Sequence, residues 1–169
     1  MNMLPSTEAS EILKDKIKKI QTLAIIEKDN KVLLAMKKRG FGVGWWNGYG
    51  GKLIGDETIE EAMLRELKEE SKIIGTKFNK RGVVNFFFED SDSYIEMHIY
   101  EITDYIGEAE ETEEMAPRWF DKSQIPLDQM WPADRQWLPL YFAGKNVEGS
   151  ATFNGETNEL IEANFKAVT

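Results

Sequence analysis

The chain has 169 residues, enough for one domain with its own core, and its composition is globular, with 41% hydrophobic and 30% charged residues. A net charge of −9 argues against binding to DNA or RNA polymers, which needs a basic surface, but leaves small phosphorylated ligands open. The absence of cysteine excludes disulfides and thiolate metal sites, and the single histidine excludes a multi-histidine zinc site.

No apolar run approaches the length that spans a bilayer, and no charged-then-apolar leader opens the chain. A chain without cysteine also suits a reducing compartment. From these features we expect a cytoplasmic, monomeric protein that does not bind membranes.

The first 21 residues are expected to stand apart from the main domain, which would span residues 22–169. Apolar side chains recur at helical spacing in this extension, which is therefore predicted to be helical (Ile12, Leu13, Ile17 and Ile20). The extension would pack on the domain or mediate association, and we assign it no chemistry.

Two apolar runs, 22–26 and 32–36, flank the turn cluster Glu-Lys-Asp-Asn-Lys and predict a β-hairpin. A long, pliable loop follows, rich in glycine (Gly40, Gly42, Gly44, Gly48, Gly50 and Gly51). Lys37, Lys38 and Arg39 precede this loop. They are either plain surface charges or anion contacts at the mouth of a phosphate site.

The next stretch predicts a helix that begins near Thr58, because Thr58 and Glu61 have the spacing of a capping box. At about 100° per residue, its apolar residues share one arc that should face a core (Ile59, Ala62, Met63 and Leu67). Glu66 and Glu70 fall inside this arc, and Glu69 lies at its edge. Three carboxylates therefore lie where a helix normally buries apolar side chains.

An uncompensated carboxylate on such a face is costly, so a partner must neutralise it. Carboxylates at positions i, i+3 and i+4 converge on one side of a helix, and hard oxygen ligands suit Mg²⁺ or Mn²⁺. These residues favour a divalent-cation site. The alternative is a solvated helix with imperfect patterning.

After the helix, residues 83–88 and 94–102 are predicted to be strands around the turn Asp-Ser-Asp-Ser. His98 alternates with apolar residues, which favours a strand side chain facing a polar surface over a ligand or general base. Phe86 and Phe88 share one strand face, either in a core or in the wall of an aromatic pocket.

An acidic, irregular connection is expected over residues 104–115, then a short strand over 117–120 and a helical turn over 121–124. Pro132 suits the first turn of a helix that Pro139 should shorten or kink. A final hairpin is predicted around Asn154-Gly155. These elements together predict a mixed sheet with a few helices, an α+β domain with three α/β/α layers.

The glutamate-rich stretch resembles the signature of the Nudix (MutT-type) hydrolases, G-x5-E-x7-R-E-U-x-E-E-x-G-U, where U is aliphatic. The chain matches the signature at all positions but one (Gly51, Glu57, Arg65, Glu66, Leu67, Glu69, Glu70 and Ile73). Lys72 replaces the second glycine, and we expect the helix to run slightly further there. The resemblance implies a Nudix fold, with the signature as a loop–helix–loop.

Further segments resemble the branch of this family that hydrolyses oxidised purine nucleoside triphosphates such as 8-oxo-dGTP, which removes damaged precursors from the nucleotide pool. These segments include MKKRGFG, WNGYGGK and QIPxxxMWPxD, and the likeness runs from Thr22 to the C-terminus. It implies a purine nucleoside triphosphate substrate, and Mg²⁺ or Mn²⁺ as cofactor.

The resemblance also implies roles for particular residues. Glu66, Glu69, Glu70 and the Gly51 carbonyl would bind the metal, with Glu114 nearby, while Glu57 and Arg65 would brace the loop against the helix. Lys37 would reach the phosphates. The remaining residues would form the purine pocket, with Trp131 stacking on the base (Thr22, Phe41, Asn47, Phe86, Phe88, Trp131 and Asp134).

One departure bears on the substrate, because Ala133 stands where the relatives have the first of two adjacent acids. Losing one hydrogen-bond partner of a buried base edge changes binding by about 1–3 kcal/mol. Other Nudix activities therefore stay open, on methylated purine triphosphates, dinucleoside polyphosphates or ADP-ribose. A non-catalytic nucleotide-binding module is also open, although such modules should have lost signature glutamates.

Overall fold

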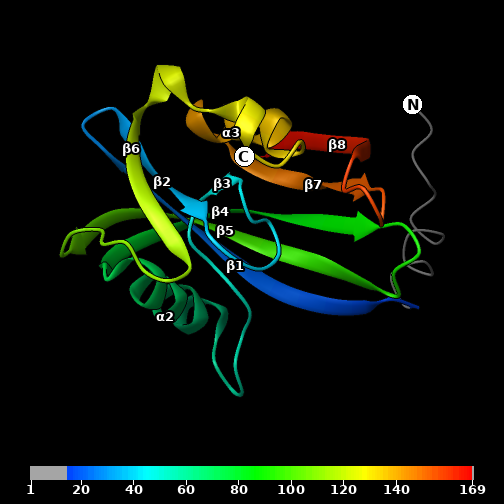
Figure 1. Cartoon of the computed structure of the whole chain (residues 1–169), viewed down its shortest axis with the longest axis horizontal. Helices are drawn as coiled ribbons and strands as arrows, with labels where there is room; N and C mark the ends of the chain where they lie inside the picture. The colour runs from blue at the N-terminus through cyan, green and yellow to red at the C-terminus, as the bar shows by residue number, and fades with distance from the viewer. Residues whose placement is uncertain (1–14, 169) are drawn as a thin grey trace.

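The structure, a computed structural model, describes residues 15–168. It contains one eight-stranded mixed sheet with helices α2 and α3 on opposite faces, which confirms the predicted α+β class and its three layers (Figure 1). In chain order the elements are β1 (Ile17–Lys28), β2 (Lys31–Lys37), β3 (Trp46–Asn47), α2 (Ile59–Ser71), β4 (Ile74–Phe88), β5 (Ser93–Ile106), β6 (Met115–Asp121), the 3-10 turns η1 (Lys122–Gln124) and η2 (Leu127–Gln129), α3 (Asp134–Phe142), β7 (Asn146–Phe153) and β8 (Leu160–Val168).

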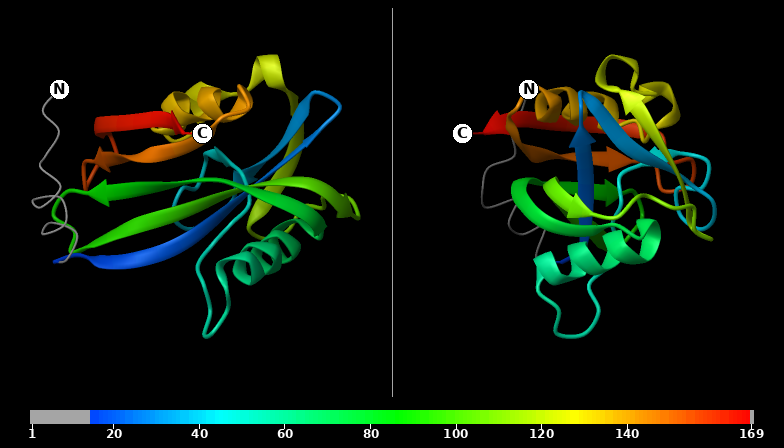
Figure 2. Two further views of the ribbon diagram at one scale, coloured as in Figure 1. Left: turned by 180° about the vertical axis from the view of Figure 1, so that it is seen from behind. Right: turned by 90° about the vertical axis from the view of Figure 1, so that its left-hand side faces the viewer.

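Two parallel pairings join the antiparallel parts of the sheet. The strand order is β3-β2-β1-β5-β4-β7-β8, and β6 pairs with β2. β1 runs parallel to β5 and β4 runs parallel to β7, whereas the remaining neighbours are antiparallel. The long central strands twist across the molecule, as the two views of Figure 2 show.

The two faces of the sheet form two hydrophobic cores. One lies under α2, where Met63 and Leu67 meet Tyr100 of β5. The other lies under α3, where Trp137 meets Ile99 of the same strand. Consecutive residues of β5 thus serve opposite cores, as the period of a strand requires. Each fully buried large apolar side chain contributes about 1.5–3 kcal/mol, so these cores fix both helices against the sheet.

The predicted first hairpin is confirmed, with a two-residue turn at Asp29 and Asn30. Both residues have positive φ, 52° and 63°. This is the backbone of the turn that matches strand twist, and Asn and Asp tolerate it.

The predicted helical extension is wrong for its described part. Ile17 and Ile20 belong to β1, which pairs in parallel with β5 from Ser93 onward. The spacing of the isoleucines fits a helix, but an open neighbouring strand offers backbone partners that override local spacing. Ile12 and Leu13 lie outside the described residues, and the boundary between an extension and a domain stays a prediction.

Strands β4 and β5 are longer than predicted. β4 begins at Ile74 and β5 ends at Ile106, so the irregular connection starts only after that residue. The pairing shifts register between Gly75 and Lys77 and again between Lys80 and Gly82. Such bulges break the alternation on which sequence patterning depends.

The last hairpin forms as predicted, but its turn does not. β8 begins at Leu160, and the Asn154 Oδ1 accepts hydrogen bonds from the backbone N–H groups of Glu156 and Thr157. A side chain on Gly155 would overlap the Glu89 carbonyl oxygen. This glycine therefore allows a close backbone approach rather than a two-residue turn.

Helix α3 is short and contains Pro139, as predicted. Buried Arg81 of β4 fixes its end, because one Nη donates to the Tyr141 carbonyl at 2.8 Å and to the Lys145 carbonyl at 2.7 Å. Its other Nη binds Glu101 at 2.8 Å. The helix that carries Asp134 and Trp137 is thereby tied to the sheet.

Candidate functional site

Helix α2 places its acids as the sequence predicted. The Thr58 hydroxyl accepts a hydrogen bond from the Glu61 N–H at 3.1 Å and caps the helix, which starts at Ile59. Glu70 is buried, with 5% of its surface exposed. The side chain of Glu66 is 18% exposed and that of Glu69 is 59% exposed. Two carboxylates therefore face the protein and one faces the rim of a cleft.

The helix does not run on past its expected end. It stops at Ser71, and Lys72 adopts the left-handed conformation with φ 72° while its N–H donates to the Lys68 carbonyl. The expectation of a longer helix is wrong, because Lys72 takes the conformation that glycine would adopt at this position.

The glycine-rich loop lies directly against the buried acids. The Gly50 N–H donates to Glu70 Oε1 at 2.9 Å, and the Gly51 carbonyl accepts the Thr22 N–H at 2.9 Å. A side chain on Gly51 would come within 2.5 Å of the Glu66 carboxyl group. The Gly51 backbone therefore lies directly against the Glu66 carboxylate and leaves no room for a side chain unless that carboxylate moves.

Arg65 joins this loop to the helix. Its guanidinium binds both oxygens of Glu57 and donates to the Lys52 carbonyl at 2.9 Å. Its Nη1 reaches Glu66 at 3.0 Å and Glu69 at 3.1 Å. The contact between Glu57 and Arg65 is the one the sequence predicted to brace the loop.

Burial and mutual repulsion disfavour the charged forms of the inner acids. The pKa of Glu70 is raised to about 8, chiefly by burial and then by repulsion from Glu66 and Glu114, against the opposing effects of the Gly50 N–H and Lys37. Burial also raises the pKa of Glu66, although Arg65 opposes this shift. A cation in the cleft would relieve both effects.

The acids are not gathered around one point. Within residues 15–168, no group of three or more histidine or acidic side chains is arranged to hold a metal ion. Arg65 draws Glu66 and Glu69 toward itself. The convergence expected from their spacing is therefore absent from these side-chain positions, and the acids would have to leave Arg65 to share a cation.

The donor set nevertheless fits a hard divalent cation. One open cleft is lined by all the predicted metal ligands, four carboxylates and a backbone glycine (Gly51, Glu66, Glu69, Glu70 and Glu114). Oxygen ligands of this kind suit Mg²⁺ or Mn²⁺. Glu70 supports the fit most directly, since a buried carboxylate gains most from a neighbouring cation.

A cavity walled by aromatic rings adjoins this cleft. The Trp131 ring lies 5.0 Å from the Phe41 ring and 5.7 Å from the Trp45 ring, at interplanar angles of 33° and 18°. Phe41 meets Phe88 edge-on at 5.9 Å. Every residue predicted to bind the substrate lines the cavity (Thr22, Lys37, Phe41, Asn47, Phe86, Phe88, Trp131 and Asp134).

The cavity and the cleft share part of their lining. Lys37, Gly50 and Glu70 line both of them. A ligand with a flat aromatic part and an anionic tail can therefore place each part in the environment that suits it.

Asp134 lies at the inner wall of the cavity. Its Oδ1 accepts a hydrogen bond from the Trp137 Nε1 at 2.9 Å, and burial raises its pKa to about 7. Ala133 is fully buried beside Phe153 and adds only a methyl group. The cavity thus has one carboxyl group at this position, and that group exchanges its proton near neutral pH.

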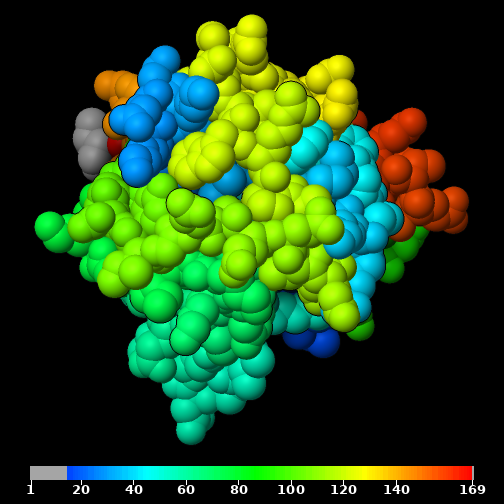
Figure 3. Space-filling view, turned by 60° about the vertical axis from the view of Figure 1, so that its left-hand side comes forward, coloured from blue at the N-terminus to red at the C-terminus, as the bar shows by residue number. Residues whose placement is uncertain are grey.

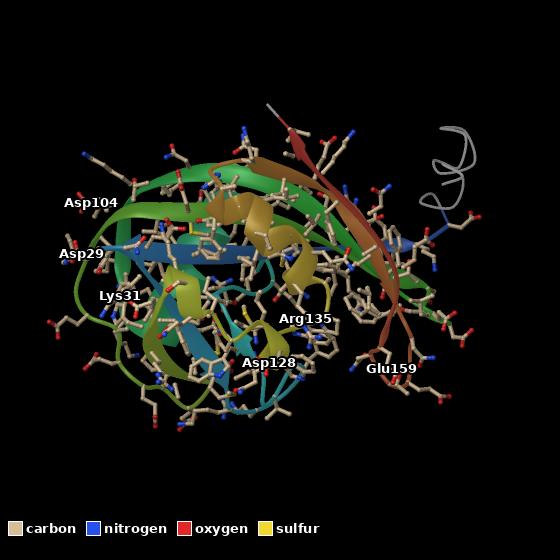
Figure 4. All side chains as sticks on the ribbon, turned by 90° about the horizontal axis from the view of Figure 1, so that it is seen from above. Asp29, Lys31, Asp104, Asp128, Arg135 and Glu159 are labelled. Carbon is tan, nitrogen blue, oxygen red and sulfur yellow. The ribbon has the colours of Figure 1, made fainter. Side chains whose placement is uncertain are left out.

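The corner before α3 positions Trp131. Arg135 Nε donates to the Leu127 carbonyl at 2.9 Å, and its Nη2 donates to the Asp128 carbonyl at 3.3 Å. Arg135 and Asp128 lie together at this corner in Figure 4. These contacts tie η2 to α3, with Trp131 on the segment between them.

Sequence reasoning missed several residues of the site. Trp45, which stacks on Trp131, was recognisable only as part of the loop rich in glycine and tryptophan. Met97, Met115, Met130 and Trp137 line the cavity; Met130 stands in the segment QIPxxxMWPxD and Met97 on a predicted strand, but neither was assigned to the site. His98 is not among the residues that line either space; it sits in β5 with Lys80 and Glu96 as polar partners.

Within residues 15–168, the structure has no helix long and apolar enough to cross a membrane.

Comparison with known proteins gives several matches. The family model described as NUDIX domain matches residues 18–141.

Among curated proteins, the oxidized purine nucleoside triphosphate hydrolase of Danio rerio is 44% identical over 137 residues, covering 81% of this chain and 88% of its own length. The protein of that description from Mus musculus is 41% identical over 138 residues, covering 82% and 88%. Among solved structures, a MutT protein from Bacillus halodurans has a TM-score of 0.75 at 23% identity, covering 88% of this chain and 97% of that chain, which shows a shared fold.

Proposed function

The chain belongs to the Nudix hydrolase family, and we propose that it hydrolyses modified purine nucleoside triphosphates, such as 8-oxo-dGTP, to the monophosphate and pyrophosphate. The observation that carries this proposal is that the aromatic cavity adjoins the acidic cleft at Lys37, Gly50 and Glu70, which line both spaces. The names of the fish and mouse relatives support the substrate class. Such an activity would remove damaged precursors from the nucleotide pool.

The aromatic cavity would take the purine. A base stacked on Trp131 gains about 1–3 kcal/mol, and the flanking phenylalanines exclude water from its edges. Asn47 is held in place by the hydrogen bond from its Nδ2 to the Trp45 carbonyl at 3.0 Å. We assign Asn47 and Asp134 to the polar edge of the base, and Thr22 to the floor.

The acidic cleft would take the phosphates. Nudix hydrolases need divalent metal ions, and we propose Mg²⁺, with Mn²⁺ as the alternative. We assign the cation to the four carboxylates and the Gly51 carbonyl; it would neutralise phosphate charge and lower the pKa of bound water. Lys37, on the border between cavity and cleft, would contact the phosphates.

In the reaction, a water oxygen attacks phosphorus, the anhydride P–O bond breaks and pyrophosphate leaves. We propose that Glu69 or Glu70 accepts the proton of the attacking water, with Glu114 a lesser candidate. Glu57 and Arg65 would keep the loop and helix in register around these acids. A monomeric state and a cytoplasmic location stay predictions.

The single acid in the cavity bears on the choice of base. Because Ala133 offers no hydrogen bond, we propose that acceptance of oxidised adenine is narrower than acceptance of 8-oxoguanine. Pyrophosphate release at fixed Mg²⁺ from 8-oxo-dGTP, 2-oxo-dATP, O6-methyl-dGTP and the undamaged nucleotides tests this order. Turnover only of ADP-ribose or dinucleoside polyphosphates would contradict the proposed substrate class.

A pair of matched variants tests the site. Glu69→Gln should lower turnover at least about a hundredfold, while Glu61→Gln on the exposed face of α2 should not. Thermal unfolding of both variants checks that the fold persists. Near-normal turnover in Glu69→Gln would contradict the role proposed for Glu69. Tight nucleotide binding without turnover in the wild type would contradict the proposed hydrolase activity.

A further inference from the structure

Three consecutive basic residues at the end of β2 are paired with acids of the connection before β6. Lys37 lies 3.6 Å from Glu114, and Arg39 Nη2 lies 3.3 Å from the same carboxylate. Arg39 Nη1 also lies 3.3 Å from Glu113. Figure 3 shows the yellow-green connection lying against the cyan loop that follows β2. Both segments line the acidic cleft.

The ion pairs of Arg39 are exposed and therefore weak. The side chain of Arg39 is 58% exposed and that of Glu113 is 86% exposed. Exposed pairs of this kind hold their partners loosely, because water and salt screen the attraction. A polyphosphate brings several negative charges at once and can displace a single carboxylate from such a cation.

Arg39 is better suited to this exchange than its neighbour Lys38. The Lys38 Nζ is bound to Glu111 at 3.1 Å and to the Thr112 carbonyl at 2.9 Å, so it ties the connection to β2. Among residues 15–168, the Arg39 side chain donates hydrogen bonds only to carboxylates, those of Glu113 and Glu114. Its planar guanidinium can also bind two phosphate oxygens at once.

We propose that Arg39 is a phosphate-binding residue of this cleft. In the ligand-free protein Glu113 and Glu114 neutralise its charge, and a bound polyphosphate replaces these two carboxylates as the partner of Arg39. This inference rests on the proposed function for the nature of the ligand. Glu113 acts as a competitor of the phosphate. Glu114, once released by Arg39, retains its ion pair with Lys37 at 3.6 Å. Arg39 thereby favours nucleotides that carry a polyphosphate tail over monophosphates.

The test compares the binding of 8-oxo-dGTP and 8-oxo-dGMP in EDTA, followed by tryptophan fluorescence, so that no hydrolysis intervenes. Arg39→Gln should weaken triphosphate binding about five- to tenfold, which corresponds to about 1–1.4 kcal/mol of binding free energy. The same variant should leave monophosphate binding unchanged. Arg39→Lys should restore part of the loss. Glu113→Gln should tighten triphosphate binding about two- to threefold, since it removes the competitor.

Arg118→Gln is the matched control, because it removes the same charge from an exposed position on β6; it should change neither dissociation constant. The inference would be overturned if Arg39→Gln weakened the binding of both nucleotides equally or of neither. It would also be overturned if Glu113→Gln did not tighten triphosphate binding, or if the wild type bound neither nucleotide. Pyrophosphate release by the wild type in Mg²⁺ is measured separately. If the wild type shows no turnover but its binding preference for the triphosphate still depends on Arg39, the proposed function is wrong and the inference about Arg39 stands.

Discussion

Arg65 binds the Glu57 carboxylate through two parallel hydrogen bonds, Nε to Oε2 at 2.6 Å and Nη2 to Oε1 at 3.0 Å. The Glu57 Oε1 also accepts the Ile54 N–H at 2.7 Å. The Arg65 hydrogen bond holds the pKa of Glu57 below its usual range. One arginine therefore fixes the loop that carries Gly51 to the helix that carries the acids.

Arg65→Lys should lower turnover about ten- to a hundredfold, because an ammonium group cannot bind both carboxylate oxygens and the loop would shift relative to the acids. Steady-state pyrophosphate release measures the effect, and circular dichroism checks the fold. Arg118→Lys, a change of the same type on β6, should leave turnover intact. Wild-type turnover in Arg65→Lys would show that the loop is held by other contacts.

Lys72→Gly should stabilise the protein by about 0.5–1 kcal/mol, since Lys72 has φ 72° and glycine adopts this conformation without steric cost. Lys68→Gly, inside the last turn of α2, should destabilise it by about 1 kcal/mol. Urea unfolding of both variants gives the two free energies. Equal destabilisation by both changes would contradict the left-handed cap.

Gly50→Ala should destabilise the protein by about 1–3 kcal/mol, because the added methyl group would overlap the Thr22 carbonyl oxygen of β1. The shift would also disturb the hydrogen bond from Gly50 to Glu70. At Gly55, which has φ 56° and open space around it, alanine should cost only about 1 kcal/mol of backbone strain. Urea midpoints compare the two, and a larger loss at Gly55 would contradict the close approach.

Asp134→Asn should change how stability depends on pH. Burial raises the pKa of Asp134 from 3.8 to about 7, so between these values the folded protein binds a proton that the unfolded chain has lost. Stability therefore falls as pH rises through this window, by up to about 1.4 kcal/mol per pH unit, and the loss is complete above pH 7.

Asparagine resembles the protonated acid and can still accept the Trp137 hydrogen bond, so the variant should gain stability over the wild type between pH 5 and pH 8. Guanidinium unfolding at both pH values measures the difference. Asp128→Asn, at an exposed position nearby, is the control and should show no such change. A constant difference between Asp134→Asn and wild type at both pH values would mean that Asp134 does not titrate in this range.

Local chemistry decided what the sequence could predict about the elements. The cap at Thr58, the first hairpin and the side of α2 that bears Glu66 and Glu70 each depend on residues within one or two turns of chain, and the structure confirms them. The strand at Ile17 and the left-handed cap at Lys72 were missed. Both depend on partners or conformations that spacing alone does not reveal.

The sequence by itself determined the chemical character of this protein, because the glutamate spacing and the glycine-flanked loop lie in one continuous stretch whose geometry a helix dictates. Only the tertiary structure decided that Lys37, Gly50 and Glu70 line both the acidic cleft and the cavity of Trp131, and that Arg65 and Arg39 pair with the acids of the cleft. Those relations join segments far apart in the chain through sheet pairing and packing, and no local spacing encodes the distance between them.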